Sequence, residues 1–542
     1  MKKILFSFLA GITLISVLPS CTNLEEDVYD KLPADSFGSS EIEVKALVGT
    51  VHNTLRRYWQ SNTWFTLNEA GGSSTVTPTR IGGDWYDGGQ YREIFMHTWT
   101  AQTSAVKSAW SVASEAIGTC NATISVLQGS EFLTDAQKTE NIADVRGVRA
   151  FWIYTMMDGF GNIPLVTDYA DKELPSVRPR QEVYNWLVQE VSEIAEQCPA
   201  GTYDNYGKFT KGAAYFLLAK LYLNAEAWGV TATGNAYGAC IDACDKVLAM
   251  GYTLEPDYKT NFGVNDQSRE GVLSAVFDES DTQNTLVLMC LTLHYADNAS
   301  DASKYSAWNG VCAQPDFVRL FDVGDLDLDA TNVADKLYSS DFNGDPRFPA
   351  TYRIGLRRSA ATGEILQTGQ NQDLNYTVAI PFIPGTERDG TPWSEVYQYT
   401  GARCQKWPYS TSLTSAMGND FHIFRLADVY LMKAEAILRS GGDVAEATKL
   451  VNTIRQRAYG DDKHNKTTVT LKDVQLERRF ELAWECWSRQ DDIRFGEFEK
   501  SFWSSSNCDI AKGDYLKIYP ISQDAFQTNQ KLVQNPGYPA FQ

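Results

Sequence analysis

The helical character of this chain is clearest in the sequence KGAAYFLLAKLYLNAEA, residues 211–227. Apolar and small side chains recur in it at intervals of three and four, a spacing that places them on one face of an α-helix. The members of this face are Ala214, Leu217, Leu218, Leu221, Tyr222 and Ala225. A second helix is predicted for residues 236–250, and Gly251 supplies its stop signal. Together the two segments predict an antiparallel helical hairpin.

The same pattern returns towards the C-terminal end. Residues 426–438 and 445–459 predict another hairpin, with Gly441 and Gly442 in its turn. A further helix pair is predicted at residues 145–158 and 184–197, and another around residues 471–488. Paired antiparallel helices packed through alanines resemble tetratricopeptide units, although the strict period of about 34 residues is absent. The sequence therefore predicts a mostly α fold with about four degenerate tetratricopeptide-like hairpins.

Residues 252–420 have a different texture, because Gly, Asn, Asp, Ser and Pro are frequent and helical periodicity is weak. Short strands are predicted at residues 271–277 and 376–382. Long ordered loops on a rigid scaffold are where binding surfaces are usually built. This loop-rich region is therefore the predicted ligand-binding region.

Composition narrows the class of ligand. The 542 residues carry a formal net charge of −20 without a Lys/Arg-rich run, so a phosphate backbone would be repelled and nucleic acid is a poor partner. The same charge disfavours strongly anionic ligands, and a neutral ligand fits best. The chain also holds 14 Trp and 27 Tyr, more aromatic surface than packing usually requires. Part of that surface is expected to serve recognition.

The N-terminus resembles a bacterial lipoprotein signal. Lys2 and Lys3 precede an apolar stretch, residues 4–17, which is too short to span a bilayer and is followed by Cys21. Cleavage before Cys21 and acylation of this residue are expected, although a secreted protein with a chance cysteine is an alternative. We predict a signal peptide at residues 1–20, a lipidated tether at 21–40 and a single domain at 41–542.

Several motifs of the chain resemble those of one known family. RLADVYLMKAEA at residues 425–436 and ERRFELAWE at residues 477–485 are similar to two consecutive helices of the SusD/RagB-like lipoproteins. The other similar blocks, in family order, are residues 77–89, 146–166, 491–496 and 519–538. Charged side chains in these blocks are expected to form ion pairs between packed helices: Asp428, Glu435, Glu477, Arg478, Arg479, Glu481, Asp492 and Arg494.

The resemblance implies a function. SusD-like proteins are outer-membrane lipoproteins of Bacteroidetes that bind glycans at the cell surface and deliver them to a TonB-dependent transporter of the SusC type. By this resemblance the chain is expected to have a mostly helical SusD-like fold, to capture a neutral oligo- or polysaccharide, and not to be an enzyme.

Exposed aromatic side chains are the predicted glycan contacts, since sugar rings present C–H faces that lie flat on Trp and Tyr. Trp85 and Tyr86, with Asp84 beside them, lie in a Gly- and Asp-rich loop where helix packing does not demand them. A second predicted group lies in the loop-rich region, which the family uses for glycan contact: Tyr295, Tyr305, Trp308 and Asn309. Tryptophans in helical or motif blocks are predicted core residues: Trp59, Trp64, Trp99, Trp110, Trp152, Trp186 and Trp484.

Two other functions stay open on the sequence alone. One is a glycoside hydrolase, for which Glu481 and Glu485 stand at i and i+4, although both would project from one helix face rather than flank a bound sugar. The other is a lipoprotein that captures peptide on the same scaffold.

No metal or other cofactor is expected. Asp325, Asp327 and Asp329 mimic the start of an EF-hand, but Ala330 and Lys336 stand where the loop requires Gly and Glu. A different calcium site at this place is an alternative. The ten cysteines and five scattered histidines indicate neither a disulfide framework nor a structural zinc site.

Overall fold

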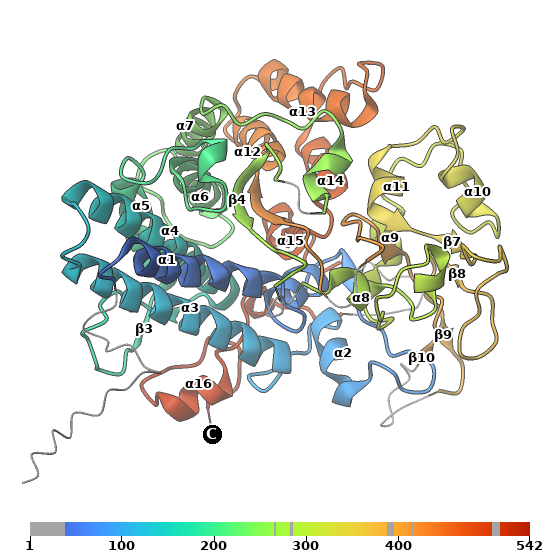
Figure 1. The fold of residues 1–542 in the computed structure, drawn as a ribbon, viewed down its shortest axis with the longest axis horizontal. Helices are drawn as coiled ribbons and strands as arrows, with labels where there is room; N and C mark the ends of the chain where they lie inside the picture. The colour runs from blue at the N-terminus through green and yellow to red at the C-terminus, as the bar shows by residue number, and fades with distance from the viewer. Residues whose placement is uncertain are drawn as a thin grey trace, which may run out of the picture.

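The computed structural model describes residues 38–264, 267–281, 286–386, 395–412, 416–500 and 510–541. Figure 1 shows long helices gathered on one side and irregular chain on the other, so the predicted mostly helical fold is confirmed. Cys21 and the signal peptide lie outside the described residues, and the predicted domain limits stay a prediction. In the part of the chain that the structure describes, no helix combines the length and apolar character needed to cross a bilayer.

Both predicted hairpins are present. The helix α6 (Lys211–Asn224) begins where the Thr210 hydroxyl caps its first turn, and it packs against α7 (Ala236–Leu248). Near the C-terminus α12 (Leu426–Arg439) packs against α13 (Val444–Tyr459). Because α12 also packs on α7, the two hairpins lie against each other. Their tetratricopeptide character stays a prediction.

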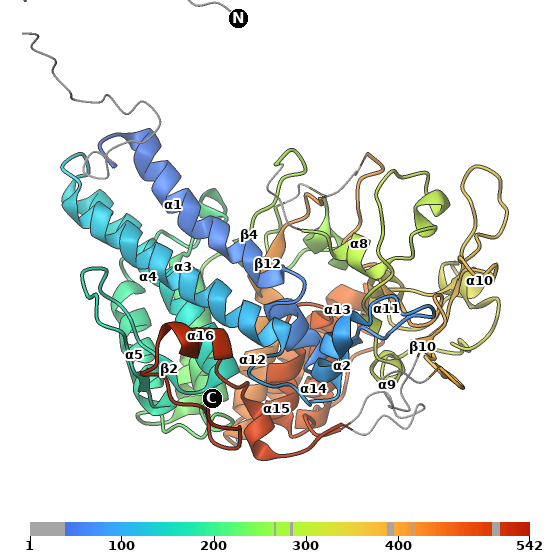
Figure 2. The same cartoon turned by 90° about the horizontal axis from the view of Figure 1, so that it is seen from below.

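The N-terminal part adds long helices to this scaffold. α3 (Ser104–Gly129) and α4 (Asp135–Phe160) pack together, and α1 (Glu41–Leu55) lies along both (Figure 2). α5 (Arg180–Ile194) connects α4 to α6. The sequence patterns indicate α5 and the buried half of α4 but not α3, because frequent Ser, Ala and Gly residues dilute the apolar period of α3.

Around residues 471–488, where a helix pair is predicted, the chain forms two helices separated by a break. α14 (Leu471–Leu482) ends before Trp484 and Cys486, which have φ of 68° and 64°, and α15 (Ser488–Phe495) then begins. The peptide N–H of Cys486 donates to the buried carboxylate of Glu69, and the Trp484 ring is fully buried. The chain therefore leaves the helix to satisfy a buried acceptor from the N-terminal part.

Short strands join the helical side to the loop-rich side. β4 (Gly271–Ala275) pairs antiparallel with β12 (Phe421–Arg425), which confirms most of the strand predicted at 271–277. The strand predicted at 376–382 is wrong, because its two ends belong to different pairs. The other pairs are β1 (Thr75–Val76) with β5 (Cys312–Ala313), β2 (Ile163–Pro164) with β3 (Val177–Arg178), β6 (Tyr352–Arg353) with β11 (Arg403–Cys404), β7 (Gly355–Leu356) with β8 (Asn375–Tyr376), and β9 (Phe382–Ile383) with β10 (Glu395–Val396). The short helices are α2 (Gln90–Phe95), α8 (Leu288–Thr292), α9 (Pro315–Val318), α10 (Val333–Leu337), α11 (Arg347–Thr351) and α16 (Gln523–Thr528).

Aromatic side chains pack into a core that extends from the helical side of the molecule into the loop-rich side. Phe421 of β12 lies between Trp59 and Trp407, with ring centroids 3.9 Å and 4.4 Å away. Of the predicted core tryptophans all are buried except Trp186, which is partly buried against the same core.

A buried network of ion pairs also fastens the loop-rich region to the C-terminal helices. Glu481 of α14 accepts hydrogen bonds from Arg347 at 2.9 Å and from Arg425 at 2.7 Å. Arg425 also pairs with Glu270 and Glu485. We call this network the Glu481 cluster; its members are Arg347, Lys406, Arg425, Arg455, Arg457, Glu270, Asp345, Glu477, Glu481 and Glu485.

The prediction that the charges of the family-like blocks form ion pairs is confirmed. Outside the Glu481 cluster, Asp428 pairs with Lys220 and Arg478, Glu435 with Arg494, and Arg479 with Asp492.

The C-terminal segment closes onto the N-terminal helices. The Tyr519 hydroxyl donates to the carbonyl of Leu67 at 2.7 Å, and the Asn535 amide donates to the carbonyl of Phe160 at 2.6 Å. Residues more than 300 positions apart are thereby in direct contact.

Candidate functional site

Three loops of the chain are held together by one buried arginine. The Arg80 guanidinium donates to the carbonyls of Asn309 (3.1 Å), Gly310 (3.0 Å) and Thr400 (2.8 Å). Burial, with the nearby charge of Arg403, lowers the pKa of Arg80 to about 9, so the guanidinium stays protonated at neutral pH. Segments that are far apart in the sequence are thus fixed around the predicted loop within residues 77–89.

Trp85 is positioned by close contacts in this arrangement. Its indole Nε1 donates to the carbonyl of Trp308 at 2.7 Å, and its backbone φ is 61°. Gly310 lies directly under the ring, since a Cβ there would lie 2.5 Å from Cζ2 of Trp85. Only glycine leaves room for the half-buried indole, which is therefore held rigidly against its neighbour.

Trp308 and Tyr295 present the most open aromatic surface of the site, with 42% and 41% of their area exposed. The Trp308 peptide N–H donates to Cys290 at the end of α8, at 2.6 Å. Burial raises the pKa of the Tyr295 phenol; the hydrogen bond with Gln398 lowers it, and the negative charge of Asp84 raises it further. We call Trp85, Tyr295 and Trp308, with Asp84 beside them, the aromatic patch.

Two of the predicted site residues are buried, which corrects the prediction for both. Tyr305 is fully buried, and its hydroxyl donates to Tyr409 at 3.1 Å. Asn309 is also fully buried, with φ of 58°, a conformation that Asn tolerates better than most residues. Tyr305 and Asn309 therefore shape the loop from beneath instead of facing a ligand. Tyr86 is half-buried in the turn beside Trp85 and stays a predicted contact.

Further aromatic side chains near the patch escape the sequence analysis. Tyr91 lies 5.2 Å from the Trp85 ring, measured between centroids. Tyr397 and Tyr399 stack on each other at 5.5 Å, and the loop that carries them is bound by Arg80. The sequence Tyr-Gln-Tyr at 397–399, in the loop-rich region, is the signal that would have pointed to this pair.

The carboxylates that suggest a hydrolase are engaged elsewhere. Burial alone would raise the pKa of Glu481, but Arg457, Arg425 and Arg347 outweigh it and hold the pKa well below its usual range. Glu485 is buried as well and binds Lys406 and Arg425. A glycosidase needs one carboxyl group that is protonated at neutral pH, and Glu481 has the opposite environment.

The EF-hand-like aspartates are likewise paired with basic side chains. Asp325 lies 2.8 Å from Lys336, and Asp329 lies 2.7 Å from Arg319. Among the described residues no group of three or more His, Cys, Asp or Glu side chains is arranged to hold a metal ion. The absence of a metal or other cofactor stays a prediction.

Comparisons with known proteins agree on one family. Residues 269–538 match the model of the SusD family. The starch-binding protein SusD of Bacteroides thetaiotaomicron is 25% identical over 433 residues, which are 76% of this chain and 75% of that protein. A SusD-like protein, P25, of Formosa agariphila is 22% identical and covers 95% of this chain and 96% of its own length.

Solved structures share the fold. A laminarin-binding SusD-like protein superposes with a TM-score of 0.67 at 22% identity, covering 92% of this chain and all of its own. A SusD-like protein of Bacteroides fragilis gives a TM-score of 0.69 at 21% identity and covers 94% of this chain. Family model, relatives and fold coincide: the chain belongs to the SusD family.

Proposed function

We propose that this protein is a non-catalytic, cell-surface glycan-binding lipoprotein. It captures an oligo- or polysaccharide on the aromatic patch and delivers it to a SusC-like TonB-dependent transporter in the outer membrane. The observation that carries this proposal is the exposed pair Trp308 and Tyr295 beside the rigidly held Trp85.

The patch has the chemistry that sugar recognition requires. Pyranose C–H faces stack on indole and phenol rings, while carboxylate and amide groups bind the hydroxyls. The exposed carboxylate of Asp84 supplies such a polar group. Starch and laminarin, named for two of the related proteins, are neutral glucans, which agrees with the net charge of −20.

A panel of oligosaccharides tests this function. Maltoheptaose, laminarihexaose, cellohexaose, xylohexaose and mannohexaose are titrated into the mature chain by calorimetry, with an unrelated peptide as a further ligand. Binding of at least one oligosaccharide, without release of new reducing ends, is the expected result. New reducing ends would indicate a hydrolase, and binding of the peptide alone would indicate a peptide-capture protein.

Trp308→Ala should weaken binding of the oligosaccharide by about 1–3 kcal/mol, because an exposed stacking surface is lost. The melting temperature should change little, since the Trp308 side chain is 42% exposed and its hydrogen bonds to Cys290 and Trp85 run through its backbone. Calorimetry and thermal unfolding measure the two effects. Trp85→Ala should weaken binding similarly but also lower stability, because its ring packs on Gly310.

Tyr169→Ala is the matched control, since Tyr169 is 52% exposed but belongs to a segment outside the patch. Equal affinities for Trp308→Ala, Tyr169→Ala and the unmodified chain would exclude the patch as the binding site.

The transporter should be found as a physical partner. Purification from native membranes in mild detergent is expected to yield a stable complex with a larger barrel protein. The oligosaccharide should bind this complex more tightly than the isolated chain, because contacts from both proteins enclose it. A chain that elutes alone, with the same affinity in membranes and in isolation, would contradict delivery while leaving glycan binding intact.

A further inference from the structure

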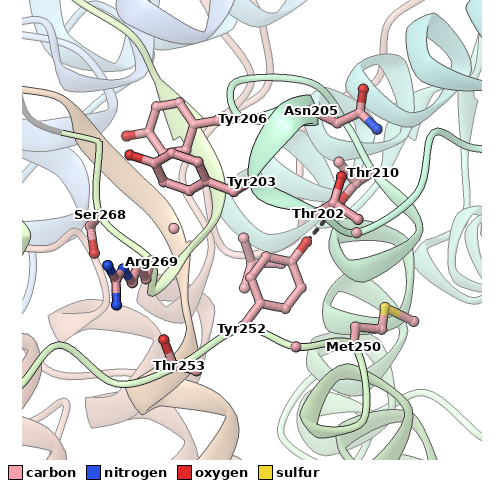
Figure 3. Close-up of a pocket in the computed structure, with 14 residues that line it drawn as sticks. Thr202, Tyr203, Asn205, Tyr206, Thr210, Met250, Tyr252, Thr253, Ser268 and Arg269 are labelled. Atoms are coloured by element: carbon pink, nitrogen blue, oxygen red, sulfur yellow. Dashed lines mark hydrogen bonds between the residues drawn. The ribbon is translucent and has the colours of Figure 1, made fainter.

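A second cavity with aromatic walls, shown in Figure 3, lies beside the helices α6 and α7. It has a volume of about 530 Å³, within the range of sites for small molecules. Its walls are the loop before α6, the turn after α7 and the segment that leads into β4. None of its lining residues belongs to the aromatic patch. We call it the tyrosine pocket.

Three tyrosines form the pocket, and the protein already satisfies the hydroxyl of each. Tyr203 donates to the carbonyl of Gln267 at 3.1 Å, and Tyr206 donates to Asp420 at 2.8 Å. The Tyr252 hydroxyl lies 3.0 Å from that of Thr210, the cap of α6. The rings are therefore held in place, and what they offer to a ligand is aromatic surface rather than phenol groups. Tyr203 is 53% exposed, so its ring is open to a ligand.

The pocket is built on a rigid part of the fold. Gly212, in the first turn of α6, makes room for Tyr252, since a Cβ there would lie 2.5 Å from its hydroxyl oxygen. Met250 closes the pocket beside Tyr252 (Figure 3). Tyr252 thus stands directly on the hairpin of α6 and α7, and Tyr203 and Tyr206 are held against it by the connection between α5 and α6.

The polar rim consists of neutral groups and one cation. Arg269 is exposed, and its guanidinium makes no hydrogen bond or ion pair with another described side chain. Thr202 and Thr253 add exposed hydroxyl groups. Among the described residues no carboxylate lines the pocket itself, whereas Glu196 lines the adjoining hollow. Donors and hydroxyls around aromatic rings match the hydroxyl and ring oxygens of a neutral sugar.

The pocket continues into a neighbouring groove, which favours a chain over a single sugar. Gly201, Thr202 and Met250 line both hollows, and the second has a volume of about 520 Å³. Tyr215 lies in the second hollow with the Lys246 ammonium 4.3 Å from its ring centroid. The continuous groove has room for several linked glycosyl units.

We propose that the tyrosine pocket is a second glycan subsite, which binds a stretch of neutral polysaccharide independently of the aromatic patch. This inference rests on the proposed function, because it assigns the same class of ligand to a separate place. A long polymer chain held at both places would dissociate more slowly than one held at either, provided that its length spans them.

The test uses the mature chain and the oligosaccharide of the panel that it binds best. Calorimetry should show two binding events, of which Tyr203→Ala weakens one by at least about tenfold and leaves the other unchanged. Tyr203→Phe, which keeps the ring, should retain both. Arg269→Gln should weaken the same event as Tyr203→Ala, and it serves as a second variant at an exposed position.

Tryptophan fluorescence distinguishes the two sites. The aromatic patch contains two tryptophans, whereas no tryptophan lines the tyrosine pocket. In the unmodified chain, the binding event that is missing from Trp308→Ala should quench the tryptophan fluorescence. The binding event that is missing from Tyr203→Ala should leave the fluorescence unchanged. A Trp308→Ala chain should therefore still bind the oligosaccharide, with heat but without quenching.

The outcomes separate this inference from the proposed function. A single binding event, abolished by Trp308→Ala and unaffected by Tyr203→Ala and Arg269→Gln, would overturn the second subsite and leave the proposed function standing. If no oligosaccharide of the panel binds the unmodified chain, the proposed function fails and the second subsite fails with it.

Discussion

Replacing Arg425 by Met should lower the free energy of unfolding by about 3–5 kcal/mol, the usual cost of removing one partner from a buried ion pair. Arg425 is almost fully buried and pairs with three carboxylates, those of Glu270, Glu481 and Glu485. Met approximates the volume of the arginine stem but carries no charge, so it cannot neutralise these three carboxylates. Urea unfolding of the mature chain, followed by circular dichroism, measures the change.

Arg319→Met is the control for charge removal in general. Arg319 binds Asp329 through two hydrogen bonds, of 2.7 Å and 2.9 Å, but both side chains are largely exposed to solvent. Its loss should cost no more than about 1 kcal/mol, because surface ion pairs are weak. If Arg425→Met were as mild as this control, the Glu481 cluster would not be what joins the loop-rich region to the scaffold.

Replacing Cys21 by Ala should move nearly all of the protein from the membrane fraction to the soluble fraction. We expect acyl chains on Cys21 to be the anchor, and each buried methylene contributes about 0.8 kcal/mol to membrane binding. The described residues offer no membrane-spanning helix as a substitute. Fractionation of cells without detergent, followed by immunoblotting, measures the distribution.

Thr22→Ala is the matched control and should remain with the membrane, because it changes the neighbouring residue and leaves the thiol in place. A Cys21→Ala chain that still sediments with membranes after a high-salt wash would show that something other than a lipid holds it.

The helical scaffold could be predicted because its signal is local. In α6 and α12 the apolar residues repeat along one face, and the caps and turns stand beside them in the sequence. The break after Leu482 could not be predicted, since it depends on Glu69, a partner 417 positions away. A period in the sequence carries no information about such a distant acceptor.

The candidate site shows the same limit. A Gly- and Asp-rich loop at Trp85 and a tryptophan at 308 indicate exposed aromatics, and Trp308 is exposed as expected. Tyr305 has the same loop-like surroundings in the sequence but is covered in the fold, where it contacts Tyr409. Exposure of a loop residue depends on which other loops lie over it, and one sequence does not record that.

The tyrosine pocket is missed by the sequence analysis for a related reason. Tyr203 and Tyr252 belong to the connections next to α6 and α7, which the helical pattern treats as turns. Their side chains meet only when the hairpin has closed.

The C-terminal segment contacts Leu67 and Phe160, so this part of the fold can form only after the end of the chain has been made. A ribosome makes the N-terminal helices first, yet the residues that cover them are among the last to be made. Until then, apolar surface around Trp64, against which Gly159 packs, lacks part of its cover. Contacts between distant residues slow folding, and incomplete chains with exposed apolar surface aggregate. We therefore expect a chain that lacks residues 519–538 to be more prone to aggregation than the full chain.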